Sequence, residues 1–106
     1  MRFDIGCVCL FLLAWLPASI GTAAIDCSRV TSNVERLICS NSRAAAAEEK
    51  MAQSFWAALR RGVPPAELRE SQRIWLNEVR NACNDVECLL RAHERRILEL
   101  DSLAPG

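Results

Sequence analysis

Apolar residues recur along the chain at the three- and four-residue spacing of α-helices, in four stretches separated by turn-forming residues. A short stretch ends near residue 39, and three longer ones cover residues 43–61, about 66–82 and 86–100. None of them alternates as a β-strand does, and no internal repeat occurs. The pattern predicts an all-α protein with a buried set of Val34, Leu37, Ile38, Met51, Phe55, Ala58, Leu59, Leu68, Trp75, Leu76, Val79, Cys83, Val86, Leu89, Leu90, His93, Ile97 and Leu100.

Residues that start and stop helices lie at the boundaries of these stretches. Ser32 and Glu35 have the spacing of a capping box before the first helix, and Asn84 and Glu87 have the same spacing before the fourth. Gly62 ends the second helix, because glycine readily adopts the left-handed backbone conformation that closes a helix. Since the connections are short, we expect successive helices to be antiparallel neighbours in an up-and-down bundle.

The first 24 residues have the three parts of a secretory signal peptide. A basic start precedes an apolar run over residues 6–16, and small residues follow as far as Ala24. Cleavage after Ala24 would leave a domain of residues 25–106, periplasmic or secreted and not stably inserted in a membrane. The alternatives are an uncleaved membrane anchor, for which the uncharged stretch of residues 5–25 is long enough, and a lipid anchor, which Asp26 before Cys27 disfavours.

Four cysteines remain after cleavage: Cys27, Cys39, Cys83 and Cys88. An even number of cysteines in a small exported chain predicts two structural disulfides. Cys83 and Cys88 can meet across a tight helical turn, and Cys27 can meet Cys39 if the leading segment folds back. We favour these two pairs, and the other pairings stay open. The predicted fold is a small disulfide-stapled antiparallel helical bundle, with a short leading helix and three longer ones.

The charge of the chain disfavours two classes of partner. Thirteen basic residues balance 13 acidic ones, so the formal net charge is zero. A neutral domain has no strong field to attract it to nucleic acid or to an anionic membrane. We therefore expect neither nucleic acid nor an anionic membrane as the partner, and the sequence carries no signal for a particular oligomeric state.

The sequence shows no pattern typical of an enzyme, a metal site or a cofactor. Zinc would need closely spaced ligands, but 11, 43 and 4 residues separate the four cysteines. The haem attachment pattern Cys-x-x-Cys-His is absent. His93, the one histidine, falls on an apolar stripe, which favours packing over a catalytic role beside Ser54 or Ser71. Carboxylates and arginines interleave on the last two helices, as on a solvated face.

Three stretches together resemble the LprI-like lysozyme-inhibitor family, over nearly all of residues 25–106. The resemblance implies an exported helical domain. His93 stands where the family commonly has Tyr, and Ala44 and Ala47 stand where larger Leu residues are frequent, which predicts a thinner core beside the second helix. The matching stretches are Asp26-Cys27 with Val34-Glu35-Arg36-Leu37-Ile38-Cys39, then Gln72-Arg73-Ile74-Trp75-Leu76 with Arg80 and Cys83, and last Cys88-Leu89 with Arg96-Ile97 and Leu100.

For function, the resemblance implies binding of a lysozyme and occlusion of its cleft. The alternative is a structural or interaction module of the bacterial envelope without lysozyme inhibition. Two exposed turns, residues 60–65 and 84–87, could contact a partner. The alternative is that both are ordinary loops between helices. Because many lysozymes are basic, we favour Asp85 and Glu87 of the acidic turn as partner-binding residues. Trp56 is added as a candidate binding hot spot.

Overall fold

The computed structural model describes residues 25–106, and the predicted signal peptide, residues 1–24, lies outside the described residues. The described span is all-α, as predicted, and contains no strand. Its two 3-10 helices are η3 (Cys27–Arg29) and η4 (Arg80–Ala82). Its α-helices are α1 (Asn33–Cys39), α2 (Ser42–Arg61), α3 (Pro65–Glu78) and α4 (Val86–Asp101).

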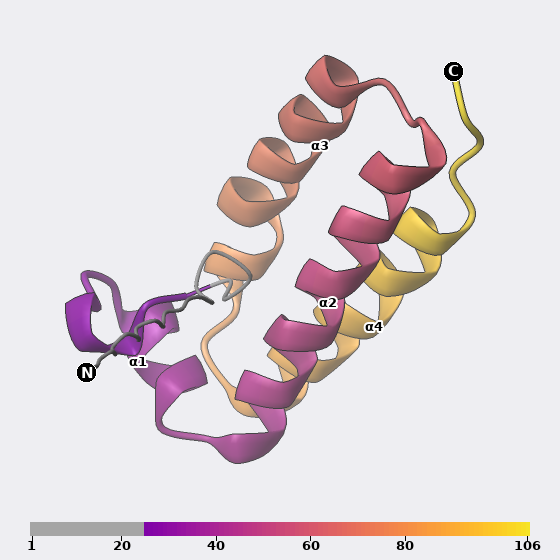
Figure 1. Ribbon diagram of the computed structural model, residues 1–106. Helices are drawn as coiled ribbons and strands as arrows, with labels where there is room; N and C mark the ends of the chain where they lie inside the picture. The colour runs from indigo at the N-terminus through magenta and orange to yellow at the C-terminus, as the bar shows by residue number, and fades with distance from the viewer. Residues whose placement is uncertain (1–24) are drawn as a thin grey trace, which may run out of the picture.

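The three long helices run up, down and up, so α2 and α4 are parallel (Figure 1). At their N-terminal ends Arg43 pairs with Glu87 at 3.3 Å. At their C-terminal ends Arg61 donates to the carbonyls of Leu100 and Leu103, at 2.8 and 2.9 Å. α3 is antiparallel to both, as predicted, but the most extensive helix contact is between α2 and α4, which are not successive in the chain. The short α1 packs against α2.

Side-chain caps fix where the helices begin and end. Ser32 accepts a hydrogen bond from the Glu35 backbone N–H at 3.1 Å, as the predicted capping box requires. Gly62 ends α2 with a φ of 96°, also as predicted. The predicted cap at Asn84 is wrong by one residue, because Asp85 accepts from the Cys88 N–H at 2.8 Å. Asn and Asp are equally good caps, so local preference did not distinguish the two registers.

The third helix is shorter than predicted. It ends at Glu78, and η4 then turns the chain toward Cys83. Val79 therefore leaves the apolar stripe and is 43% exposed, contrary to the prediction that it is buried. The side chain of Arg80, the next residue, is buried in its place.

Two apolar clusters form the core. One lies between α2, α3 and the C-terminal part of α4, and contains Met51, Ala58, Val63, Leu68, Trp75 and Leu100. The other joins α1 to the N-terminal parts of α2 and α4, and contains Val34, Ile38, Ala44, Cys83 and Leu89. Both clusters lie wholly within residues 25–106, so this span carries its own hydrophobic core.

Both predicted disulfides are confirmed. Cys27 is bonded to Cys39 and Cys83 to Cys88, with Cα–Cα distances of 5.8 and 5.5 Å. The first bond holds η3 against the end of α1. Asp26 caps η3, and its hydrogen bonds from the Ser28 hydroxyl and backbone hold the pKa of Asp26 below its usual value.

Replacing Cys27 and Cys39 together by Ala should lower the free energy of unfolding by about 3 kcal/mol, because the bond closes a loop of 12 residues. The same change at Cys83 and Cys88, which are 5 positions apart, should remove about 2 kcal/mol of loop entropy. Urea unfolding followed by helical circular dichroism measures both. Unchanged stability of either variant would contradict a structural role for its bond.

Candidate functional site

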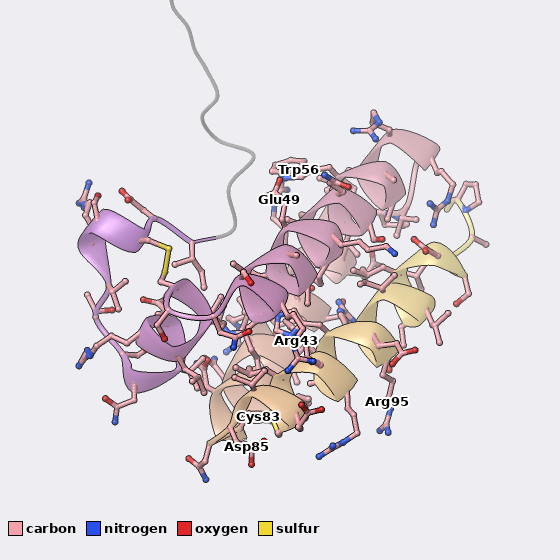
Figure 2. All side chains as sticks on the ribbon, turned by 90° about the horizontal axis from the view of Figure 1, so that it is seen from below. Arg43, Glu49, Trp56, Cys83, Asp85 and Arg95 are labelled. Atoms are coloured by element: carbon pink, nitrogen blue, oxygen red, sulfur yellow. A yellow bond between two sulfur atoms is a disulfide. The ribbon has the colours of Figure 1, made fainter. Side chains whose placement is uncertain are left out.

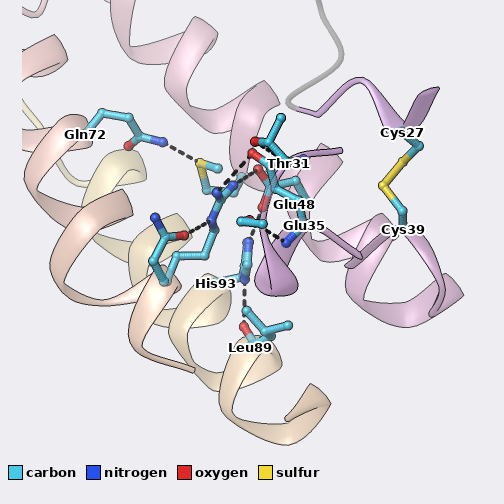
Figure 3. Close-up of polar contacts among 12 residues, drawn as sticks. Cys27, Thr31, Glu35, Cys39, Glu48, Gln72, Leu89 and His93 are labelled. Atoms are coloured by element: carbon cyan, nitrogen blue, oxygen red, sulfur yellow. Dashed lines mark hydrogen bonds and ion pairs between the residues drawn. A yellow bond between two sulfur atoms is a disulfide. The ribbon is translucent and has the colours of Figure 1, made fainter. Parts of the chain in front are cut away.

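A buried ionic network joins α2 to two segments that are distant from it in the sequence, η4 and α4. Glu48 of α2, Arg80 of η4 and His93 of α4 are 3%, 5% and 0% exposed. The Glu48 carboxylate accepts from Arg80 Nη1 at 3.0 Å and contacts His93 Nε2 at 2.5 Å (Figure 3). Arg80 also approaches Glu35 of α1, with Nη2 3.8 Å from Oε2. The network therefore connects every α-helix of the described span except α3, which is joined to Arg80 through the chain.

His93 is packed inside the bundle, and within residues 25–106 no hydroxyl or thiol is among its hydrogen-bond partners. Its Nδ1 lies 2.7 Å from the Leu89 carbonyl, which can only accept, so Nδ1 carries a hydrogen. Its Nε2 lies 2.5 Å from Glu48 Oε1, and the indole of Trp75 packs edge-on against the imidazole with the ring centroids 5.1 Å apart. Neither Ser54 nor Ser71 is a hydrogen-bond partner of His93. The predicted packing role is confirmed, and the burial is complete rather than partial.

A second polar network joins α3 to its neighbours. Arg96 of α4 donates to Gln72 Oε1 at 3.0 Å and to Ser71 Oγ at 2.9 Å. The Gln72 amide in turn donates to the Met51 sulfur of α2 at 3.0 Å. Glu99 accepts from the remaining arm of Arg96 at 3.2 Å. α3 packs less closely against the bundle than α2 and α4 pack against each other. These side-chain hydrogen bonds therefore fix the position of α3.

Several of the residues that carry the family resemblance lie inside the bundle. Gln72, Trp75, Arg80 and Arg96 all belong to the two networks or to the core beside them. Glu35 accepts from the Thr31 backbone N–H ahead of α1 and faces Arg80. These residues therefore fix the packing of the helices, whereas Arg73 and Ile74 of the same matching stretch are exposed.

The family described as "Lysozyme inhibitor LprI" matches residues 27–100. The chain belongs to this family. The match takes in both disulfides and both networks of the LprI domain. No curated protein and no solved structure matches the chain. The family is one of inhibitors rather than catalysts, which implies a protein partner, and with the two disulfides it indicates an extracytoplasmic protein.

In the LprI domain the predicted partner-binding residues fall in two separate places. Asp85 and Glu87 lie together at the N-terminal end of α4, and both are exposed. Trp56 is 40% exposed on α2, and lies on the other side of the bundle from Asp85 in Figure 2. Arg43, which pairs with Glu87, lies on the same helix as Trp56 and 13 residues before it. This separation corresponds to about 20 Å along α2. The acidic pair and Trp56 therefore cannot form one small contact.

Sequence reasoning missed the buried charges. Arg80 and Arg96 were assigned to a solvated face, and this is wrong, because both fill polar positions inside the bundle. A signal was present in the spacing: Glu48 lies four residues after Ala44 and three before Met51, on the buried stripe of α2. A glutamate on the apolar stripe of one helix and a histidine on the apolar stripe of another indicate that the two side chains meet inside the bundle.

Two further properties of the LprI domain concern metal ions and membranes. Within residues 25–106, no group of His, Cys, Asp and Glu side chains is arranged to bind a metal ion. In the same span, no helix is long and apolar enough to cross a bilayer.

Replacing Glu48 by Ala should destabilise the domain by about 3–5 kcal/mol, because it leaves Arg80 and His93 buried without their shared acceptor. Glu48→Gln should cost less, since an amide still accepts from Arg80. Glu49→Ala, a change at the neighbouring and more exposed position, should change stability by less than about 0.5 kcal/mol. Chemical unfolding of the three variants makes the comparison, and a similar small cost at both positions would contradict the network.

Proposed function

We propose that this LprI domain binds a lysozyme and occludes its cleft with the loop from Cys83 to Cys88. The observation that carries the proposal is the form of this loop within a family of lysozyme inhibitors. The Cys83–Cys88 bond closes it into a small ring at one end of the bundle. Its residues 84, 85 and 87 are exposed.

The loop is held in one conformation before any partner arrives. Cys83 is 3% exposed in the second core cluster, so one side of the ring is anchored. Asp85 caps α4 through its hydrogen bond to Cys88, which fixes the other side. A contact surface that is already ordered loses little conformational entropy on binding, and this favours a tight complex.

The charge of the loop fits a basic enzyme. Asp85 and Glu87 place two carboxylates on an exposed turn, and many lysozymes are strongly basic. Glu87 is paired with Arg43, but both side chains are more than 60% exposed. Such a surface ion pair contributes little, so Glu87 can exchange Arg43 for a cation of the partner. Complementary charge would act mainly on the rate of association and on its salt dependence.

Export is part of the proposal. Residues 1–24 would direct the chain out of the cytoplasm and be removed after Ala24, leaving a periplasmic or secreted domain. The disulfides support this, because such bonds form and persist in oxidising compartments.

A second function is favoured by Trp56. A tryptophan that is 40% exposed, with its ring edge-on to Phe55 at 5.6 Å, is a typical anchor for another protein. In this alternative the domain is an interaction module of the envelope and does not inhibit lysozyme. The two functions use different surfaces, so variants at position 56 and in the loop distinguish them.

The test is titration of the oxidised domain, residues 25–106, against basic lysozymes, with calorimetry for binding and cell-wall lysis for inhibition. The variant Asp85→Asn with Glu87→Gln removes two charges but keeps a good cap at position 85. We expect this variant to bind about tenfold more weakly or worse.

Glu78→Gln with Glu94→Gln is the matched control, because it removes two exposed carboxylates elsewhere. It should leave affinity within about twofold, as expected for charges outside the contact. Equal losses in both double variants would contradict the loop as the contact. If the unaltered domain bound none of several lysozyme types, the inhibitor function itself would be wrong.

A further inference from the structure

A groove of about 290 Å³ lies between α3 and α4 and has no role in the proposed inhibition. Its apolar lining comes from Trp75 and Val79 on one side, Ala92 on the other, and the Cys83–Cys88 disulfide at one end. Val79, which the early end of α3 leaves outside the core, is exposed here. Val79 is the exposed apolar residue of this lining, whereas Trp75 and Cys83 line the groove as largely buried side chains, at 6% and 3% exposed.

Two arginines without partners stand along the α4 side of this groove. Arg91 and Arg95 line it and are exposed, and neither forms an ion pair or side-chain hydrogen bond with any residue in 25–106. Figure 2 shows Arg95 extending outward from α4. They are four residues apart, so their side chains lie on the same face one turn apart and repel each other. Glu99 also lines the groove, but its carboxylate is bound to Arg96.

An anion between the two guanidinium groups would relieve this repulsion. Arginine presents several N–H donors in a planar fork, which suits a carboxylate better than a point charge does. The occupant of the groove should therefore have one anionic end, near Arg91 and Arg95, and an apolar body along Trp75 and Val79.

The walls of the groove favour an alkyl chain over a peptide. The backbone groups along the α4 wall are bonded within the helix, so they cannot pair with the N–H and C=O groups of a bound peptide. An alkyl chain needs no such partners. The volume lies near the lower end of the range for small-molecule sites, which suits one chain rather than the two of a phospholipid.

We propose that this groove binds a single-chain anionic amphiphile, with its carboxylate held by Arg91 and Arg95 and its alkyl chain lying on Trp75 and Val79. The site does not depend on lysozyme binding, because its rim is cationic whereas the inhibitory loop is acidic. The same domain could then respond to free fatty acids at the envelope as well as to a protein.

Decanoate is a suitable probe, used below its micelle concentration with the oxidised domain, residues 25–106. Trp56→Phe makes Trp75 the only tryptophan of this span, so a change in its fluorescence reports on the groove itself. We expect saturable one-to-one binding by calorimetry, with a matching change in Trp75 emission. Decanol, which lacks the charge, and acetate, which lacks the chain, should each bind about tenfold more weakly or worse.

Arg91→Gln with Arg95→Gln should weaken decanoate binding by about tenfold or more, because charge-assisted hydrogen bonds are lost. Arg60→Gln with Arg69→Gln removes two exposed arginines elsewhere and should leave binding unchanged. The proposal is overturned if decanoate does not saturate the domain, if decanol binds equally well, or if both double variants lose the same affinity. Binding only to vesicles of phosphatidylglycerol would also overturn it, in favour of a membrane surface.

Discussion

The arrangement of the helices depends on one buried carboxylate, that of Glu48, which serves both Arg80 and His93. Burying a charge is unfavourable unless partners replace its hydration. Glu48 lies 32 and 45 residues before Arg80 and His93, so the three side chains meet only when α2 packs against η4 and α4. The network therefore specifies the register of α2, η4 and α4, and Glu35 brings α1 into the same arrangement. The apolar clusters on either side stabilise the fold by burying apolar surface. Burial of apolar surface alone tolerates more than one packing arrangement.

This division of roles explains what membership of the LprI family does and does not fix. The residues that mark the family, such as Gln72, Trp75 and Arg80, hold the helices together from the inside. A domain built in this way can keep its core while its outer residues vary. The charged side chains of the acidic loop and of the groove, Asp85, Glu87, Arg91 and Arg95, are exposed and do not belong to the stretches that carry the resemblance. Trp75 and the Cys83–Cys88 disulfide, which do belong to them, also line the groove. We infer that family membership specifies the shape of the domain, and that the choice of partner is set by side chains the motif does not include.

The sequence predicted much of the fold, because the signals concerned are local. Helix periodicity, the cap at Ser32, the stop at Gly62 and both disulfide pairs follow from neighbouring residues or short spacings. The failures are where distant contacts decide. The end of α3, the parallel contact of α2 with α4 and the burial of Arg80 all depend on partners from elsewhere in the chain. Of the candidate site, the sequence located the exposed acidic turn but not the groove, since the groove exists only where two helices meet.

A double-mutant cycle between Glu48 and Arg80 tests the central claim most directly. Each residue is replaced by Met, singly and together, and the free energy of unfolding of the four proteins is measured by denaturant titration. We predict that each single change leaves an unpaired buried charge and costs about 3–5 kcal/mol, whereas the double change costs far less than the sum, with a coupling of about 2 kcal/mol or more. Additive costs would contradict the account, because they would mean that the two side chains stabilise the bundle independently.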